Sequence, residues 1–129
     1  MFEDRPVLIV EDNVYLAMDL AATVEQLDAR VVGPAGTVAE GLALLDSEQV
    51  AGAALDYELP CGDVTPLARA LVLRRVPFVI HSSAPVAARM TLLGPAIPVL
   101  IKPIDPRDLL AILAGELRAA DRQAPARGG

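Results

Sequence analysis

Five short apolar runs alternate with five segments of helical period, and this alternation limits the folds that the chain can adopt. The runs are largely continuous rather than alternately polar, as is typical of strands buried on both faces of a sheet. They lie at Val7–Val10, Arg30–Val32, Ala51–Leu55, Pro77–His81 and Val99–Ile101. We expect helices at Val14–Leu27, from a Thr37 cap to about Leu45, from Thr65 or Pro66 onward, at Ala84–Leu93, and from Pro106 to about Ala119.

Strands that alternate with helices predict a mostly parallel sheet covered on both faces. Because crossover connections are right-handed, the best solution is an α/β doubly wound fold. We expect a five-stranded parallel sheet in the flavodoxin-like order 2-1-3-4-5 with five flanking helices. The 129 residues amount to one ordinary domain. We assign residues 1–119 to this domain and expect 120–129, rich in Ala, Gly, Pro and Arg, to be a disordered tail.

Composition narrows the classes of partner. A net charge of −6 argues against a nucleic-acid surface and suits either a cation-binding pocket or a partner with a basic patch. No apolar run approaches membrane-spanning length, so we expect no membrane partner. The charged N-terminus is unlike a secretory signal, and a single cysteine is compatible with a reducing compartment. A cytoplasmic location is therefore expected.

Polar residues of the kinds that take part in catalysis or metal binding lie where the predicted strands end. Glu11 and Asp12 follow the first run, Asp56 follows Leu55 of the third, Ser82 and Ser83 follow the fourth, and Lys102 follows the last. In doubly wound folds ligands bind at the carboxyl ends of the strands. We therefore expect these side chains to converge on one edge of the sheet.

Three carboxylates in one pocket repel one another, and a hard divalent cation relieves that repulsion. Mg²⁺ usually takes one or two carboxylates together with water and phosphate oxygens. We expect Asp12 and Asp56 to bind Mg²⁺ directly and Glu11 to act through a water. The backbone carbonyl of Glu58, in the turn after Asp56, is a further candidate ligand.

A carboxylate in such a site can attack a phosphoryl group and form an aspartyl-phosphate. Catalysis of phosphoryl transfer is mostly positioning and neutralisation of charge. Asp56 is the candidate acceptor, and Lys102 would neutralise one phosphoryl oxygen. A hydroxyl would serve another oxygen; Ser82 is the first candidate and Ser83 stands beside it.

The chain resembles the receiver domain of two-component response regulators over roughly residues 5–117. The resemblance rests on four segments in order and at family spacing: Val7–Asp12, Leu55–Pro60, Pro77–Ser82 and Leu100–Pro103. It implies that Asp56 accepts phosphate from a sensor histidine kinase or phosphotransfer protein, with Mg²⁺ at Glu11, Asp12 and Asp56. It also implies that Lys102 and Ser82 sense the phosphate, and that a conformational switch signals to a downstream protein partner.

Two positions depart from the usual receiver pattern. The aromatic residue that receivers commonly carry three positions before the lysine is Val99 here, and Ser83 replaces the usual Ala or Gly after the hydroxyl residue. These departures resemble a subgroup of stand-alone receivers. They also support an alternative, a pseudo-receiver that docks without being phosphorylated. A third hypothesis is a small phosphatase, with Glu58 at the position of a general acid, but we expect no turnover enzyme.

Two further expectations concern the extent of the chain and its one histidine. If the chain is complete, as Met1 and the predicted tail favour, it is a single-domain regulator; if it is a piece, it could be the receiver of a hybrid kinase. His81 lies on a predicted buried strand, where we expect a locally hydrogen-bonded core histidine rather than a metal ligand.

Overall fold

The structure, a computed structural model, describes residues 1–60, 62–93 and 97–123. Its centre is a five-stranded, all-parallel sheet in the order β2-β1-β3-β6-β7. This order confirms the predicted doubly wound fold. The sheet strands are β1 (Pro6–Val10), β2 (Arg30–Ala35), β3 (Gly52–Asp56), β6 (Phe78–Ser82) and β7 (Val99–Ile101). The α-helices are α1 (Val14–Gln26), α2 (Val38–Ser47), α3 (Thr65–Leu73), α4 (Ala87–Met90) and α5 (Pro106–Gln123).

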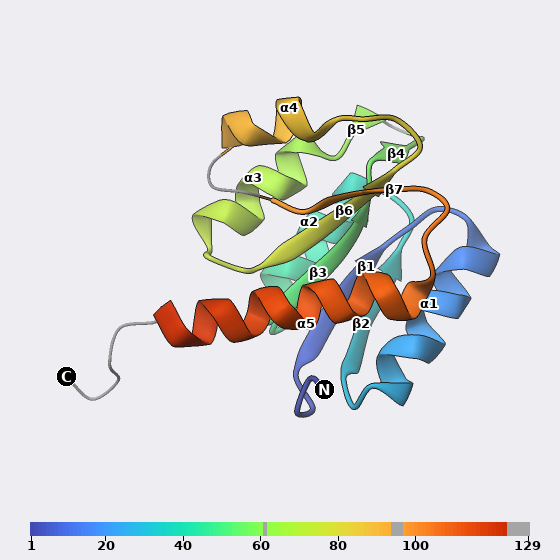
Figure 1. Cartoon of the computed structure of the whole chain (residues 1–129). Coiled ribbons are helices and arrows are strands. Elements are labelled where there is room, and N and C mark those ends of the chain that lie inside the picture. Colours follow the sequence, from blue (N-terminus) through green and yellow to red (C-terminus); the bar gives the residue numbers. More distant parts are fainter. Residues whose placement is uncertain (61, 94–96, 124–129) are drawn as a thin grey trace.

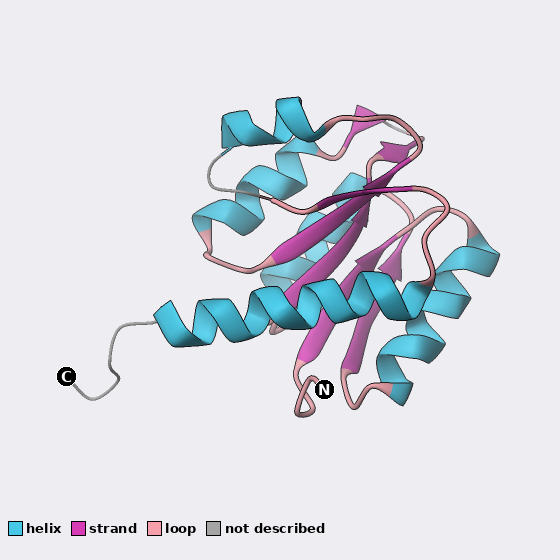
Figure 2. Ribbon diagram, viewed as in Figure 1, coloured by secondary structure: helices cyan, strands magenta, loops and turns pink. Residues whose placement is uncertain are grey.

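Helices cover both faces of the sheet. Figure 1 shows α1 and α5 in front of it and α2 and α3 behind, and Figure 2 shows the same three layers by element type. Within β1, Val7 and Ile9 are buried against the α1 and α5 side, whereas Leu8 and Val10 are buried on the opposite side. This alternation follows from the two-residue period of a strand. Each strand of the central sheet can therefore be apolar throughout.

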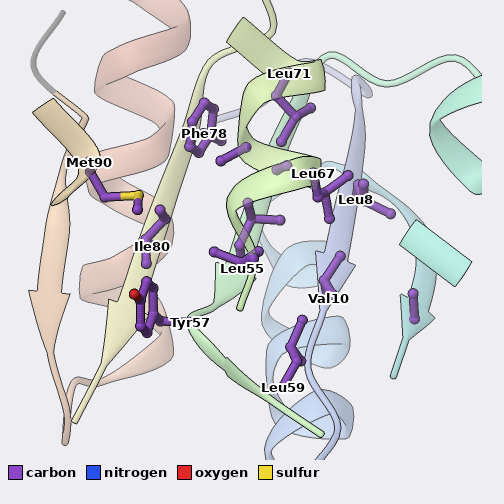
Figure 3. Close-up of a cluster of buried hydrophobic side chains, with 14 of the residues drawn as sticks. Leu8, Val10, Leu55, Tyr57, Leu59, Leu67, Leu71, Phe78, Ile80 and Met90 are labelled. Carbon is purple, nitrogen blue, oxygen red and sulfur yellow. The ribbon is translucent and has the colours of Figure 1, made fainter. Parts of the chain in front are cut away.

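Figure 3 shows the core on the α2 and α3 side of the sheet. Leu8, Val10 and Leu55 of the strands face Leu67 and Leu71 of α3. All five side chains are fully buried. Burial of aliphatic side chains stabilises the fold by about 1.5–3 kcal/mol for each fully buried residue. This packing fixes β1 and β3 side by side, so that their carboxyl ends also lie together.

Polar side chains fix where three of the helices begin. Asn13 caps α1 by accepting a hydrogen bond from the backbone N–H of Leu16 at 3.1 Å. Thr37 caps α2 in the same way through Glu40, at 3.1 Å. Asp105 accepts from the N–H of Arg107 at 2.8 Å, one residue inside α5. These caps satisfy donors that a helix start leaves free, and they confirm the starts predicted from the sequence.

Gly52 lets α5 lie close to the strand that carries Asp56. A Cβ atom at Gly52 would lie 3.3 Å from Leu117 Cδ1 and 3.4 Å from Leu113 Cδ1, both in α5. At the shorter distance Leu117 would have to give by a few tenths of an ångström. The absence of a side chain at Gly52 therefore permits this close approach of β3 and α5, with Asp56 at the far end of β3.

Two predicted boundaries were wrong because contacts with other parts of the chain extend the elements. β2 continues to Ala35 instead of stopping at Gly33-Pro34, with an irregular register between Leu8 and Val10 of β1. Gly33 has a positive φ of 95°, which a glycine tolerates. The last helix runs to Gln123 rather than Ala119, so residues 120–123 are helical and not a disordered tail. Asp121 anchors this turn through an ion pair with Arg5 at 3.0 Å. Residues 124–129 lie outside the described part of the chain.

Two other differences lie near the far edge of the sheet. The helix predicted at Ala84–Leu93 is only the four-residue α4, followed by a 3₁₀ helix at Thr91–Leu93. Pro85 disfavours helical backbone at the residue before it, so the helix begins later. A two-stranded antiparallel ladder, β4 (Glu58–Leu59) with β5 (Gly62–Asp63), was not predicted. Within the described residues, no helix is long and apolar enough to cross a membrane.

Candidate functional site

Asp56 ends β3 and lies at the centre of a polar cluster on the carboxyl edge of the sheet. It is only 2% exposed. Its Oδ1 accepts a hydrogen bond from Lys102 Nζ at 3.0 Å and another from the backbone N–H of Glu58 at 3.0 Å. A buried carboxylate requires such partners, because its desolvation is otherwise very costly. The hydrogen bonds from Lys102 and Glu58 thus hold Asp56 in one orientation.

Lys102 follows β7 and supplies the positive charge of the cluster. Its side chain remains 26% exposed, and its Nζ lies 3.7 Å from Glu58 Oε1 as well as 3.0 Å from Asp56. Burial alone would lower the pKa of Lys102, but the hydrogen bond and the charge of Asp56 outweigh burial and raise the pKa above its ordinary value. Lys102 is therefore a permanent cation at the edge of the site.

Glu58 reaches across the site to the end of β6. Its Oε2 accepts a hydrogen bond from Ser82 Oγ at 2.6 Å. Its Oε1 accepts from the backbone N–H of Ser83 at 3.0 Å and from Ser83 Oγ at 2.9 Å. Ser82 Oγ in turn accepts from the N–H of Ala84 at 3.1 Å. Both serines predicted as phosphate ligands therefore contact the same carboxylate.

These hydrogen bonds hold Glu58 as an anion. Burial alone would raise the pKa of Glu58, but the hydrogen bonds from Ser82 and Ser83, with the charge of Lys102, keep it below its ordinary value. We predicted a role for the backbone carbonyl of Glu58, whereas its side chain makes most of the contacts. The sequence places Glu58 two residues after Asp56 but does not fix the direction of its side chain, so its hydrogen bonds with both serines were not predicted.

Glu11 and His81 form the buried side of the site. Glu11 directly follows β1. His81 lies on β6, where it is paired with Asp56 of β3. Both side chains are almost fully buried, and His81 Nε2 lies 3.5 Å from Glu11 Oε1. Neither atom has a hydrogen-bond partner within the described structure. Glu11 Oε2, by contrast, accepts from the backbone N–H of Asn13 at 3.0 Å.

Burial determines the charge of both groups. It raises the pKa of Glu11 to about 7, and the neighbouring Asp56 adds to this rise. It lowers the pKa of His81, against the attraction of Asp56. The imidazole is therefore neutral near pH 7, with a lone pair available on one of its nitrogens. His81 is buried as expected of a core histidine, but its Nε2 lacks the expected local hydrogen bond.

The structure brings together six of the seven predicted site residues. They are Glu11, Asp56, Glu58, Ser82, Ser83 and Lys102. Asp12, predicted as a direct metal ligand, is exposed, and its side chain makes no hydrogen bond or ion pair among residues 1–60, 62–93 and 97–123. His81 lies on the buried strand next to the site, where we expected a core histidine rather than a ligand. The structure brings it into the site by pairing it in register with Asp56.

The residues present fit a bound divalent cation. One ligand atom from each of Glu11, Asp56 and His81 lies within 4.8 Å of the other two. Two of these side chains are carboxylates, which divalent cations prefer, and Glu11 Oε1 is buried without a partner. Such orphaned buried atoms are rare in folded proteins. A cation between them would remove both the orphaned acceptor and the repulsion between carboxylates.

The fold matches that of known signalling domains. No protein-family model and no curated protein matches the chain. Among solved structures, a CheY-like response regulator receiver domain protein from Methanospirillum hungatei JF-1 aligns over 93% of this chain and 98% of its own, with 26% identity and a TM-score of 0.84. The non-phosphorylated HemR receiver domain from Leptospira biflexa aligns over 97% of this chain and 98% of its own, with 26% identity and a TM-score of 0.76.

A longer protein shares the same unit. The response regulator PhyR from Brucella abortus aligns with 92% of this chain but with only 49% of its own length, at 26% identity and a TM-score of 0.76. The neighbours are consistently receiver domains that cover nearly the whole chain. The resemblance found in the sequence is thus confirmed, and the chain has the fold of a response regulator receiver domain.

Proposed function

We propose that the chain is a phospho-accepting receiver that takes a phosphoryl group onto Asp56 in a two-component phosphorelay. The observation that carries this proposal is the buried Asp56 carboxylate held at 3.0 Å by Lys102. A structural ion pair is usually placed on the surface, because a buried one stabilises little. A charged carboxylate fixed beside a lysine at a sheet edge is instead suited to nucleophilic attack.

The transfer needs little chemistry from the protein besides positioning. An Asp56 oxygen attacks phosphorus, the P–N bond of the donor phosphohistidine breaks, and the electron pair returns to the imidazole of the kinase or phosphotransfer protein. Mg²⁺ held by Glu11, Asp12 and Asp56 would supply neutralisation of phosphoryl charge. Lys102 neutralises a further oxygen. The product stays on Asp56, so the chain acts as a switch rather than as a turnover enzyme.

The serine side of the site supports a conformational response. Glu58 now accepts the hydrogen bonds of Ser82 and Ser83, which a phosphoryl oxygen would compete for. Ser82 also contacts the N–H of Ala84, in the segment that leads to α4. A change at Ser82 would therefore reach α4 without the aromatic residue that Val99 replaces. We infer that phosphorylation shifts a two-state equilibrium of this edge and signals to a downstream protein.

A surface for the phosphate donor lies beside the acidic site. Val14, Tyr15 and Met18, in the first turns of α1, are large apolar side chains that are mostly exposed. Exposed apolar groups clustered next to a polar site are typical of protein contacts. We propose that they contact the kinase or phosphotransfer protein. Because that donor chemistry is cytoplasmic, we place the chain in the cytoplasm.

The decisive measurement is the intact mass of the protein after incubation with acetyl phosphate, with and without Mg²⁺. We expect one phosphoryl group on the wild type with Mg²⁺ and none on Asp56→Ala. Asp19→Asn, which removes an exposed carboxylate of α1, is the matched control and should retain the adduct. An adduct that persists in Asp56→Ala would contradict the proposal.

A second candidate function is a pseudo-receiver that docks without phosphorylation. It is favoured by Glu58, whose carboxylate already occupies the donors that a phosphoryl group would use. Val99, in place of the aromatic residue that receivers commonly carry, also favours this candidate. The same mass measurement separates the two, provided that phosphoramidate, with its P–N bond, is tested beside acetyl phosphate. No adduct from either donor would favour the pseudo-receiver.

A further inference from the structure

Two buried polar atoms face each other without a hydrogen bond on the α1 and α5 side of the site. They are Glu11 Oε1 and His81 Nε2, 3.5 Å apart. A buried polar atom without a partner is unfavourable, and such atoms are rare in folded proteins. Two such atoms next to each other, beside the Asp56 carboxylate, are arranged to share one common partner.

We propose that Glu11, Asp56 and His81 form a binding site for a transition-metal ion of the Zn²⁺ class, with the His81 imidazole as a ligand. This inference rests on the proposed function, because it concerns the metal chemistry of the same phosphoacceptor site. It goes beyond that function in adding a nitrogen ligand and therefore a different class of metal.

The distances favour a metal over a proton as the shared partner. Two ligand atoms about 2.0–2.1 Å from a tetrahedral ion lie about 3.3–3.4 Å apart. The observed distance of 3.5 Å between Glu11 Oε1 and His81 Nε2 is close to that value. The two atoms make no hydrogen bond with each other. A ligand atom of Asp56 also lies within 4.8 Å of one ligand atom of Glu11 and one of His81.

The ligand types determine which metals bind. Imidazole suits Zn²⁺, Cu²⁺, Ni²⁺ and iron, whereas Mg²⁺ prefers oxygen ligands only. The three candidate ligands are buried, so they offer a dry, preorganised set of one nitrogen and two carboxylates. His81 is held by its place in β6, in register with Asp56. The side chains therefore discriminate between metals through His81, and Asp12 remains free to serve Mg²⁺ with Asp56.

The single histidine makes a direct test possible. His81 is the only imidazole of the chain, so a long-range ¹H–¹⁵N spectrum reports on it alone. Cys61→Ser removes the only thiol, a competing zinc ligand. We expect Zn²⁺ to produce the large, saturable shift of the Nε2 resonance that direct coordination causes, complete at one equivalent. Mg²⁺, which prefers oxygen ligands, should produce only a smaller shift. An Nε2 resonance unchanged at saturating Zn²⁺ would overturn the proposal.

Variants of the carboxylate ligand show whether the ion binds here. Glu11→Gln keeps the side-chain shape and should weaken Zn²⁺ binding at least tenfold, since changes around metal ligands typically cost 10–100-fold in affinity. Glu40→Gln removes an exposed carboxylate of α2 and is the matched control, with unchanged affinity. Equal weakening in both variants, or in neither, would contradict a site at Glu11. Circular dichroism establishes that each variant is folded.

The metal site and the proposed function can fail separately. The phosphoryl adduct with Mg²⁺ tests Asp56 as acceptor, and the Nε2 shift with Zn²⁺ tests His81 as ligand. An Nε2 shift in a protein that forms no adduct keeps the metal site and rejects the phosphoacceptor. An adduct without the shift does the reverse. In His81→Gln, we expect Zn²⁺ affinity to fall at least tenfold.

Discussion

The site has two halves that differ in how their polar atoms are satisfied. The inner half, Glu11 with His81, is almost fully buried and leaves two atoms without hydrogen bonds. The outer half, Glu58 with Ser82, Ser83 and Lys102, is more exposed, and its carboxylate accepts three hydrogen bonds. Asp56 lies between the halves and is held by Lys102.

This difference indicates what each half is suited to bind. The inner half presents carboxylate and imidazole lone pairs to one another, so it is suited to a cation. The outer half already holds an anion, the Glu58 carboxylate, in contact with serine hydroxyls and near a lysine. A receiver must bind both a cation and a phosphoryl anion. In this chain Glu11 and His81 are already positioned for a cation. A phosphoryl group, by contrast, must displace the contacts of Glu58 with Ser82 and Ser83.

The largest effect is expected in the inner half, from Glu11→Gln without divalent metal. The pKa of Glu11 in the folded state, about 7, exceeds its ordinary 4.5, so the folded chain holds a proton that the unfolded chain has lost between these pH values. The contribution of Glu11 to the free energy of unfolding of the wild type therefore falls as pH rises from 4.5 to 7, by at most about 3 kcal/mol. Glu11→Gln lacks this loss and should gain relative stability over that range.

Urea unfolding of both proteins at pH 5, 6 and 7.5 measures this gain. His81 acts in the opposite direction, because its lowered pKa costs stability as pH falls below its ordinary value of 6.5. Because His81 Nε2 lies 3.5 Å from Glu11 Oε1, the same measurement on His81→Gln and on the double variant separates the two contributions. A difference that stays constant with pH would mean that Glu11 is not the proton-binding group.

Removing the positive charge between the halves should have the next largest effect. Lys102→Met leaves the buried Asp56 carboxylate without its ion-pair partner and should destabilise the chain by about 2 kcal/mol, somewhat less than for a fully buried pair. Thermal or urea unfolding at pH 7 measures the loss. Asp56→Asn in the same background should restore most of it, and failure to do so would show that Lys102 acts elsewhere.

The outer half is tested through the lifetime of the phosphoryl group. Glu58→Gln should retain phosphorylation and lengthen the lifetime about tenfold, which corresponds to removing about 1.4 kcal/mol of repulsion and competition for Ser82. The decay of the acetyl-phosphate adduct, followed by intact mass, gives this rate. Glu40→Gln is the control for loss of a carboxylate. An unchanged or faster decay in Glu58→Gln would mean that Glu58 does not compete with the phosphoryl group.

The smallest effect distinguishes the two serines. Ser83→Ala should cost less than about 0.5 kcal/mol, because its hydroxyl is exposed and its backbone N–H still donates to Glu58. Ser82→Ala removes a fully buried hydroxyl that contacts both Glu58 and Ala84 and should cost about 1–2 kcal/mol. Urea unfolding compares the two directly. Equal costs would contradict the assignment of Ser82 as the principal hydroxyl.

The architecture was predictable because long-range pairing follows from patterns visible along the chain. Apolar runs and capped helical segments gave the five strands, their order and most boundaries. The exceptions depend on tertiary context. Two-residue pairing between Glu58–Leu59 and Gly62–Asp63 has too little pattern to detect, and the last turn of α5 depends on Arg5, more than a hundred residues away.

The site was predictable in composition but not in side-chain direction. Strand ends placed Asp56, Ser82 and Lys102 at one edge, since parallel strands share their carboxyl end. Whether Glu58 uses its carbonyl or its carboxylate depends on a rotamer, which spacing does not fix. The role of His81 depends on sheet register with Asp56, and register becomes visible only when strands are paired.

The contacts of Glu58 have a practical consequence for genetic work on this chain. Substituting glutamate for the acceptor aspartate is a common way to imitate a phosphorylated state. Here a native glutamate already presents its oxygens to the hydroxyl of Ser82 and to Ser83, with Lys102 close by. An Asp56→Glu allele would add a second carboxylate to donors that are already occupied. Its phenotype should therefore resemble that of the unmodified protein deprived of its acceptor, rather than that of the signalling form.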